Sequence, residues 1–374
     1  MALVKGASDS LVMSNRLLDH RLVSFISSWL DDLPETEPSR LIQNRNQAFI
    51  GDALRGMGFI LEPQEAYLLP EQRENSKCLL PYLSGEDLNS DPEQKPSRFV
   101  ICFRNWDLED AQKYPDLLRI LEERVKPIRD KVKEKREREH WWLFARYRGE
   151  LRKAIAPLGR VLTRAVVSDT HAIAFMPKTM IFNHKVIVFA FEDEFHFSVL
   201  QSSAHEFWMR RFTSTMRTDT NYSISDCFIS FPFPQNPSRQ ASIEAGNIGA
   251  QYHEQRQQVM LGRQIGLTSF YNLFHDRRQV DNDIEFLRRL HEKMDLAVLA
   301  CYGWADIDMK HAFYLNDRKK SRYMPSREAQ REIFSRLMAL NQEVAAEEAA
   351  QWAEVEQDTA AQDAEEEESN DGEV

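Results

Sequence analysis

The segment from Arg160 to Pro234 constrains the fold of this 374-residue chain more than any other stretch. It contains closely spaced runs rich in β-branched and aromatic residues, which are typical of strands. An amphipathic helical run and a polar loop lie among them. The predicted elements, in order, are three strands, a helix, a loop and a last strand: Val161 to Val167, His171 to Met176, Lys185 to Phe191, Glu194 to Phe212, Thr213 to Asp226 and Cys227 to Phe233. A rigid mixed α/β scaffold that presents a long polar loop is typical of recognition modules.

The rest of the chain divides by its hydrophobic periodicity. Strands are predicted upstream at Cys78 to Leu83 and Ser97 to Phe103, and three prolines between 232 and 237 mark a boundary beyond which the periodicity is helical. The expected fold class is α+β: a mixed α/β domain, then an all-helical C-terminal domain and a disordered acidic tail. The expected regions are a helical and strand connector, the mixed domain, the helical domain, and an Ala- and Glu-rich helix with the tail, at residues 1–70, 71–236, 237–325 and 326–374.

Two further helices are expected near the start of the chain and after the upstream strands. Leu11 to Leu30 has apolar residues at helical spacing. Asp107 to Arg138 has alternating charges that would form pairs one helical turn apart, which is typical of a long solvated helix.

Charge is distributed unevenly. The formal net charge is −11, but residues 343–374 contain 13 acidic residues and neither Lys nor Arg, so residues 1–342 carry +2. Between Arg104 and Arg164 there are 17 basic and 11 acidic residues. A basic region in a chain whose acidity lies at one end is compatible with phosphate binding. An acidic tail can also compete for such a surface, although a solvated tail is the simpler interpretation.

The sequence shows no catalytic constellation. Its four cysteines are widely separated and lie in apolar runs, which indicates buried free thiols rather than a zinc site. It contains no zinc-protease helix, nucleophile elbow or phosphate loop. Asp87, Glu93 and Lys95 match a metal-dependent nuclease only loosely, because they lie in a turn-rich loop. Without a signal peptide or an 18-residue apolar run, a cytoplasmic protein is expected.

An aromatic and basic cluster follows the charged region. It contains Trp141, Trp142 and Phe144, with Arg146 and Arg148 close behind. Aromatic side chains interleaved with arginines can stack on nucleic-acid bases. The more common alternative is the start of an amphipathic helix that packs its rings on the core.

Several long phrases together resemble one protein family. They are LLPYLSGEDLNS (79–90), FRNWDLEDAQKYP (103–115), LQSSAHEFWMRR (200–211), TDTNYSISDCFISFPFP (218–234) and YHEQRQQVMLGRQIGLTSFYNLFHD (252–276). They are similar to the target-recognition and C-terminal helical regions of MmeI-like adenine-specific DNA methyltransferases, which include single-chain restriction and modification enzymes. The resemblance covers roughly residues 1 to 320, and ALRGMGFILEPQEA (53–66) resembles the connection that leaves the methyltransferase domain.

The resemblance implies that this chain reads a DNA sequence while a catalytic domain methylates a flipped adenine. The family's catalytic domain binds S-adenosylmethionine, and its Asn-Pro-Pro-Tyr motif does not occur in this sequence. We therefore expect no cofactor in this chain, double-stranded DNA as its partner, and a methyltransferase polypeptide as a possible second partner. Two alternatives remain open: a fragment that supports methylation only with a separate catalytic polypeptide, and a protein-docking unit that does not bind DNA.

Base readout requires bidentate or short polar side chains at the major-groove edge. The loops of the opening segment supply the candidates, which are Arg164, Ser168, His171, Arg217, Asp219 and Asn221. For each of them a purely structural role is the alternative, such as a turn cap at Asp219 or an ion pair at Arg164. Phosphate contacts, which position the protein without specifying sequence, are predicted at Arg146, Arg148, Arg210 and Arg211.

Overall fold

The computed structural model describes residues 16–18, 21–23, 37–69, 75–216, 219–316 and 318–370. The chain forms two compact units, Met1–Ser39 and Arg40–Val374. In the first unit β1 (Arg16–Leu18) pairs antiparallel with β2 (Arg21–Val23), with Leu17 opposite Leu22. The helix predicted from Leu11 to Leu30 is therefore wrong at these six residues. Apolar side chains five positions apart can meet across a hairpin, so the spacing alone did not establish a helix.

A four-stranded sheet organises the second unit. Its strands, in spatial order, are β3 (Ala48–Ile50), β11 (Val186–Phe189), β7 (Arg160–Ala165) and β9 (Ala174–Pro177), all antiparallel. All four residues of β11 and five of the six residues of β7 are buried, because both faces of these central strands are covered. The predicted strands at 161–167, 171–176 and 185–191 are confirmed to within a few residues.

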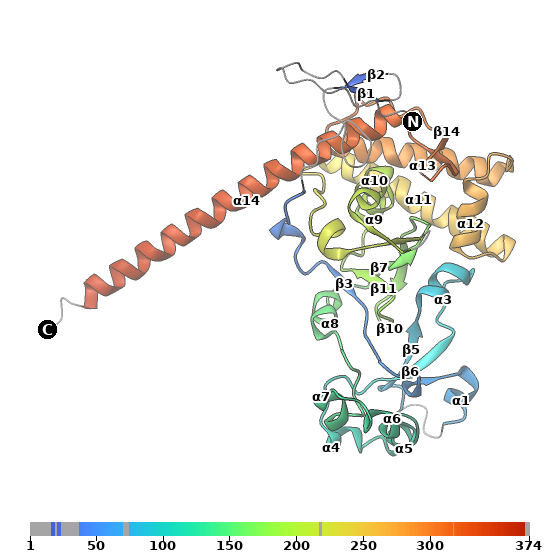
Figure 1. Ribbon diagram of the computed structural model, residues 1–374, viewed down its shortest axis with the longest axis vertical. Coiled ribbons are helices and arrows are strands. Elements are labelled where there is room, and N and C mark those ends of the chain that lie inside the picture. The colour runs from blue at the N-terminus through green and yellow to red at the C-terminus, as the bar shows by residue number, and fades with distance from the viewer. Residues whose placement is uncertain are drawn as a thin grey trace, which may run out of the picture. The chain divides into compact units, whose positions relative to one another are not determined.

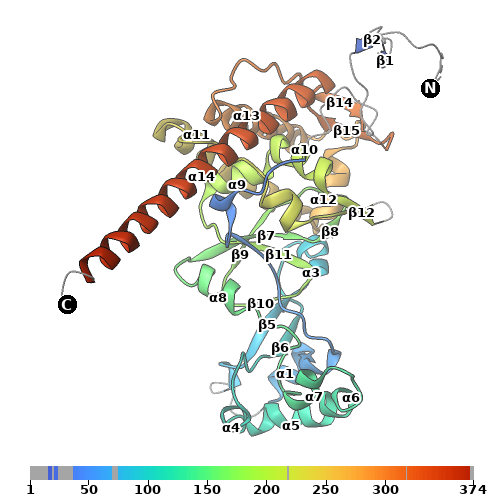
Figure 2. The same cartoon turned by 60° about the vertical axis from the view of Figure 1, so that its left-hand side comes forward.

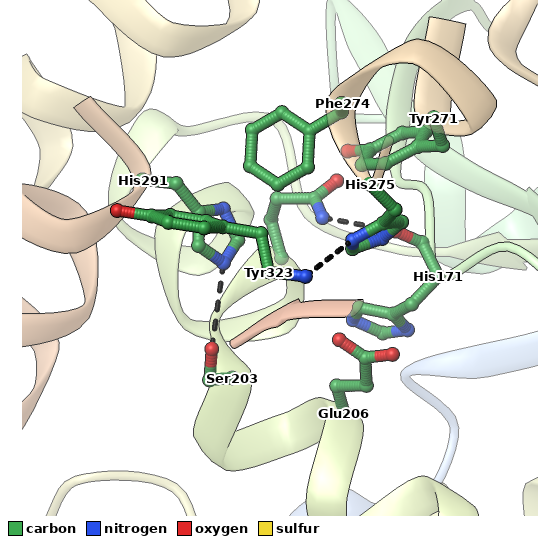
Figure 3. Close-up of a pocket in the computed structure, with 9 residues that line it drawn as sticks. His171, Ser203, Glu206, Tyr271, Phe274, His275, His291 and Tyr323 are labelled. Carbon is green, nitrogen blue, oxygen red and sulfur yellow. Dashed lines mark hydrogen bonds between the residues drawn. The ribbon is translucent and has the colours of Figure 1, made fainter. Parts of the chain in front are cut away.

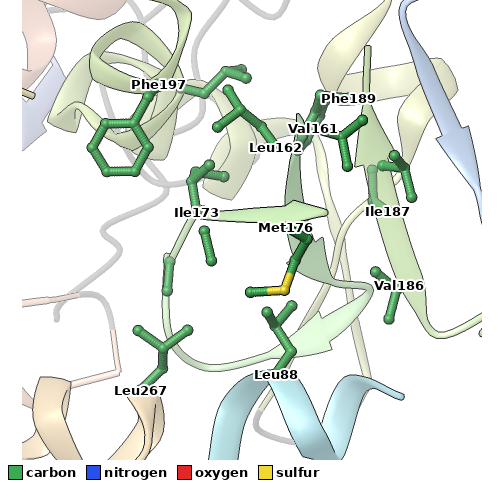
Figure 4. Packing of buried hydrophobic residues seen from close by; sticks show 14 of the residues in the cluster. Leu88, Val161, Leu162, Ile173, Met176, Val186, Ile187, Phe189, Phe197 and Leu267 are labelled. Carbon is green, nitrogen blue, oxygen red and sulfur yellow. The ribbon is translucent and has the colours of Figure 1, made fainter. Parts of the chain in front are cut away.

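Three helices help to bury the central sheet. They are α3 (Gly85–Ser90), α9 (Glu194–Gln201) and α12 (Leu267–Phe274). Figure 4 shows Leu88, Phe197 and Leu267 from these helices around the side chains of the central strands. All three side chains are fully buried, so segments from distant parts of the sequence share one hydrophobic core.

A second hydrophobic core lies around another sheet. The strand order there is β10 (Ile181–Phe182), β5 (Leu79–Leu83), β6 (Arg98–Ile101) and β4 (Ile60–Leu61). β10 connects the two cores, because successive side chains of a strand point to opposite faces: Ile181 belongs to the second core and Phe182 to the first. Figures 1 and 2 place this second core on the side of β7 and β11 away from α9 and α10 (Ser203–Phe212).

The long helix predicted from Asp107 to Arg138 is wrong. The chain forms four short helices instead, α4 (Leu108–Ala111), α5 (Pro115–Arg124), α6 (Lys126–Arg129) and α7 (Lys135–Glu139). Pro115 and Pro127 lie in the first turns of α5 and α6. Proline lacks the N–H that would continue a preceding helix, so each proline marks a new start.

The remaining predictions near this region have mixed outcomes. Trp141, Trp142 and Phe144 are buried in the second core, and the Trp142 ring N–H donates to the Trp106 carbonyl at 2.9 Å. The predicted packing on the core is confirmed, but the predicted helix start is wrong, because residues 141–148 are not helical and α8 begins at Gly149. The predicted helix from Glu194 to Phe212 is interrupted at Ser202, which ends α9 and caps α10. The last predicted strand, Cys227 to Phe233, is wrong, since a π-helix (Ile224–Phe228) and a turn occupy that segment.

The C-terminal part is helical with one β-hairpin. Its helices are α11 (Arg239–Arg263), α12, α13 (Asn282–Cys301) and α14 (Arg327–Asn370). The hairpin consists of β14 (Ala312–Leu315) and β15 (Ser321–Met324), so the expectation of helices alone in residues 237–325 is corrected. α14 extends into the acidic stretch that was predicted to be disordered. The domain boundaries proposed from the sequence at residues 70, 236 and 325 stay predictions.

Candidate functional site

A small polar sheet carries three of the six residues proposed for base readout, Ser168, Asp219 and Asn221. Its strands are β12 (Ser214–Met216), β13 (Asp219–Asn221) and β8 (Val167–Ser168). Met216 pairs with Asp219 and Thr220 pairs with Ser168. The Thr220 hydroxyl donates to the Ser168 carbonyl, and the Thr213 hydroxyl donates to the Asn221 carbonyl. Because these strands are only two or three residues long, the side-chain hydrogen bonds supplement a short backbone ladder.

Arg164 and His171 are buried, and Arg164 packs on Tyr222, the residue after β13. The Arg164 guanidinium lies 4.4 Å from the centre of the Tyr222 ring, and its Nη1 donates to His171 Nδ1 at 3.3 Å. His171 Nε2 donates to the Leu200 carbonyl at 2.7 Å, which leaves Nδ1 as the acceptor. Burial lowers the pKa of Arg164 to about 10. Burial, and then the charge of Arg164, lowers the pKa of His171 well below its ordinary value, so this imidazole is neutral.

The structure separates the six predicted readout residues into two groups. Arg164, Ser168 and His171 are 1%, 9% and 4% exposed, and each is hydrogen-bonded within the protein. In this conformation Arg164 and His171 make their hydrogen bonds inside the protein, and the readout roles of all three residues stay predictions. Asn221 is half-buried on β13, and Asp219 begins the same strand. Arg217 lies outside the described residues, and its readout role stays a prediction.

A cluster of basic side chains converges on Asp169, the residue after β8. Its carboxylate accepts hydrogen bonds from Arg318 at 3.1 Å, Lys320 at 3.0 Å and Arg322 at 2.9 Å. Partial burial raises the pKa of Asp169, but the hydrogen bond from Lys320 and the surrounding positive charges outweigh it, so the pKa lies below its ordinary value. Three cations therefore share one ionised carboxylate, and the cluster keeps a positive excess.

The three cations come from the hairpin of β14 and β15 and its loop. The side-chain oxygen of Asn316 accepts the N–H groups of Arg318 at 3.1 Å and Lys320 at 2.9 Å. Lys319 has φ of 57°, the left-handed conformation that closes the turn. The base of the hairpin is held elsewhere, because the Tyr323 N–H donates to His275 Nδ1 at 3.2 Å. These contacts define the backbone from Arg318 to Lys320, and the side chains of Arg318, Lys320 and Arg322 reach Asp169.

The four predicted phosphate contacts lie in two places. Arg210 Nε donates to Glu206 at 2.7 Å and its Nη2 donates to the Asp169 carbonyl at 3.2 Å, so it adjoins the basic cluster. The Arg211 guanidinium lies 5.2 Å from the centre of the Phe334 ring. Arg146 is exposed, and Arg148 precedes α8 (Gly149–Ile155), which Figures 1 and 2 place away from β14. Their phosphate roles stay predictions.

A second polar cluster is buried between α10 and α13. Ser203 Oγ donates to Asp295 Oδ2 at 2.6 Å, and His291 Nε2 lies 3.4 Å from the same hydroxyl across the cavity drawn in Figure 3. The serine contacts the carboxylate directly, whereas a hydrolase triad places the imidazole between them. The cavity volume of about 10 Å³ is sufficient for about one water molecule. This cluster is therefore a structural hydrogen-bond network and cannot admit a substrate.

The part of the chain that the structure describes contains no candidate metal site. No group of three or more His, Cys, Asp or Glu residues there could hold a metal ion. Asp87 accepts hydrogen bonds from the Ser84 N–H and hydroxyl as part of a helix cap, whereas Glu93 pairs with Lys95. The three side chains of the loose nuclease match therefore do not form one site. All four cysteines are free and buried, as predicted. Among the described helices, none is both long and apolar enough to cross a membrane.

The basic hairpin is the functional candidate that the sequence reasoning missed. A local signal was present, because the basic run from Arg318 to Arg322 is flanked by aromatic residues of high strand propensity. No pattern in the sequence indicated that this basic run lies close to Asp169. Residues 169 and 322 are 153 positions apart, and only the fold brings them together.

Comparisons with known proteins find one matching family and a solved structure of similar fold. A family model described as MmeI, target recognition domain, matches residues 36–235, which is more than half of the chain. A solved structure of the Type IIL restriction-modification enzyme MmeI in complex with DNA aligns with a TM-score of 0.64 at 16% identity. The alignment covers 87% of this chain and 39% of that one, so this chain spans well under half of its length. No curated protein matches. At this identity the structural likeness establishes the fold.

Proposed function

Because the chain belongs to the family of the MmeI target recognition domain, we propose that it recognises a specific sequence in double-stranded DNA. The observation that carries this proposal is the family match over residues 36–235. That range contains both the central sheet and the polar sheet of β12, β13 and β8. The solved relative of similar fold is itself described as an MmeI complex with DNA, which supports the choice of ligand.

The architecture suits such a role. Beside the polar sheet, the Arg164 guanidinium packs on the ring of Tyr222, the residue after β13, and the Ser168 carbonyl of β8 accepts the Thr220 hydroxyl. A two-stranded ribbon is narrow enough to enter the major groove, where each base pair presents a distinct pattern of donors and acceptors. We assign base readout to the β12–β13 ribbon, with Arg217, Asp219 and Asn221 as the candidate readers. Of the other candidates, Ser168 pairs with Thr220 of β13, while Arg164 and His171 are buried beside Tyr222, the residue after that strand.

A more specific proposal concerns the reaction in which this DNA recognition takes part. We assign the chain to the specificity part of an adenine-N6 DNA methyltransferase in a restriction-modification or phage-defence system of the cytoplasm. A catalytic domain outside this sequence would bind S-adenosylmethionine and methylate the flipped base. Purified chain alone is then expected to transfer no labelled methyl group to duplex DNA. Addition of a methyltransferase polypeptide of this family is expected to produce methylation at one sequence.

Selection from a random pool tests sequence recognition directly. The purified chain is incubated with a random duplex library, and the bound fraction is sequenced after several rounds. The proposal predicts enrichment of one short motif. A bound fraction as random in sequence as the input would contradict sequence recognition.

Two arginine variants separate readout from simple attraction to the backbone. Arg217→Ala is expected to weaken binding to the enriched motif by roughly 1 to 3 kcal/mol and to relax one base position. Arg146→Ala, on an exposed side chain, is expected to lower affinity for all sequences and to flatten the salt dependence. Equal losses on cognate and random duplex for Arg217→Ala would remove it from the readers.

A further inference from the structure

The hairpin of residues 312–324 lies outside the segment that matches the recognition-domain family, yet its basic side chains contact that segment at Asp169. The match ends at residue 235, and the hairpin loop reaches Asp169 inside it. The family match therefore assigns no role to this hairpin. Its contacts and charges have to be considered by themselves.

Stability does not account for the concentration of positive charge at the loop. The side chains of Arg318, Lys320 and Arg322 are 29%, 45% and 19% exposed, and Asp169 is 24% exposed. Partly exposed ion pairs contribute little to folding, typically about 1 kcal/mol or less each. Three cations on one carboxylate also repel one another. Lys319 is exposed at the same turn and adds a fourth positive charge.

The basic cluster around Asp169 lies close to the β12–β13 ribbon. Asp169 directly follows Ser168, whose carbonyl accepts the Thr220 hydroxyl of β13. The excess positive charge is therefore one strand away from the ribbon. In protein–DNA complexes, backbone contacts beside a reading element fix its register, while base contacts supply the specificity. Positive charge at this position would face the DNA phosphates on either side of a groove that holds the β12–β13 ribbon.

We propose that the hairpin of residues 312–324 binds the DNA phosphate backbone beside the reading ribbon, and that Asp169 is the positioning residue that couples the two. Lys319 and Lys320 contact phosphates. Asp169 holds Arg318 and Arg322 and thereby fixes the hairpin relative to β8. This inference rests on the proposed function for the kind of ligand, but its readout is independent of any base sequence.

The salt dependence of binding tests the phosphate contacts. Affinity for a fluorescent duplex pool of random sequence is measured over a series of KCl concentrations. Each phosphate contact contributes about 0.9 to the slope of log affinity against log salt. Lys319→Ala and Lys320→Ala are each expected to reduce the slope by about 0.9, and the double variant by about twice that. The motif enriched from a random library is expected to stay the same.

Lys95→Ala is the matched control. Lys95 is 74% exposed, pairs with Glu93 and lies before β6, outside the basic region from Arg104 to Arg164. Its removal is expected to leave the salt slope unchanged. Wild-type slopes for the Lys319 and Lys320 variants would overturn the phosphate contacts. If the chain enriches no motif but the hairpin variants lower the slope, the hairpin proposal stands and sequence recognition fails.

Asp169→Asn tests the coupling. This change keeps a side chain of the same shape and removes the charge that holds Arg318 and Arg322. The expected result is a motif with lower information content, with an unchanged melting temperature and a salt slope at least as steep as that of the wild type. A purely structural aspartate would lower the melting temperature and leave the motif of the folded fraction intact, and that result would overturn the positioning role.

Discussion

At the scale of single residues, buried charges are held by partners from distant positions. Arg129 is 1% exposed; its Nη1 donates to Glu137, and its Nη2 donates to the Leu54 carbonyl at 2.7 Å. Burial lowers the pKa of Arg129, but the charge of Glu137 opposes that shift. The pair joins α6 and α7 to the segment before β4. Helix breaks in this region are thus compensated by a side-chain bridge within the second core.

Removing the negative partner of this bridge should be costly. Glu137→Gln leaves Arg129 as an uncompensated buried cation, so we expect a loss of roughly 3 to 5 kcal/mol in the free energy of unfolding. Urea denaturation of the two proteins measures it. Glu139→Gln is the matched control on the same helix, because Glu139 is 55% exposed and lies 3.6 Å from Lys135. The control should change stability by less than about 0.5 kcal/mol, and similar losses for both variants would refute the bridge.

At the scale of elements, the helices of the C-terminal part pack closely against those of the mixed domain. α11 crosses α9 at Gly249, where an added Cβ would lie 2.0 Å from Ser198 Oγ and 3.1 Å from the Glu194 carbonyl oxygen. The Ser198 hydroxyl itself donates to the Ala245 carbonyl of α11 at 2.7 Å. A hydrogen bond and a glycine contact together fix how these two helices cross.

Two glycine substitutions in one helix should have opposite signs. Gly249→Ala forces α9 and α11 apart, and we expect it to destabilise the fold by about 1 to 3 kcal/mol. At Gly262, also in α11, an added Cβ would meet no atom within 4 Å. Gly262→Ala should therefore stabilise the helix by about 0.5 to 1 kcal/mol. Thermal unfolding of the two variants provides the comparison, and a stable Gly249→Ala protein would contradict the close crossing.

At the scale of the whole molecule, buried histidines make stability depend on pH. Burial lowers the pKa of both His253 and His275 to about 3, and the charge of Arg256 contributes at His253. Since the folded pKa lies below the unfolded value of about 6.5, the unfolded chain binds more protons between these values. Stability is thus complete above about pH 6.5 and is lost as the pH falls toward 3.

Each such histidine contributes a slope of up to about 1.4 kcal/mol per pH unit in that window. His253→Phe keeps a ring among Phe175 and Phe197, whose centroids lie 5.0 and 5.4 Å from it, and removes one titrating group. Chemical denaturation between pH 7 and about pH 5 should therefore show a shallower decline in the variant. Identical slopes in wild type and variant would mean that His253 titrates normally in the folded protein.

The sequence alone determined the features that depend on local patterns. Hydrophobic runs predicted β5, β6, β7 and β11 and the helical character of the chain after residue 237, because strands and helices have distinct periods. The long resemblance phrases also identified the family, and the family match over residues 36–235 confirms it. The sequence also contains Pro115 and Pro127, which indicate helix boundaries within Asp107 to Arg138. The prediction of one long helix there followed the alternating charges instead.

Only the tertiary structure decided which polar residues face outward and which charges meet. Arg164 and His171 looked like loop readers, yet both lie inside the fold, because burial depends on what packs above a strand and not on the strand's own sequence. The meeting of Asp169 with Arg322 likewise joins positions 153 residues apart. Such contacts result from chain topology, which local periodicity does not encode, and they place the basic hairpin beside the ribbon proposed to read DNA.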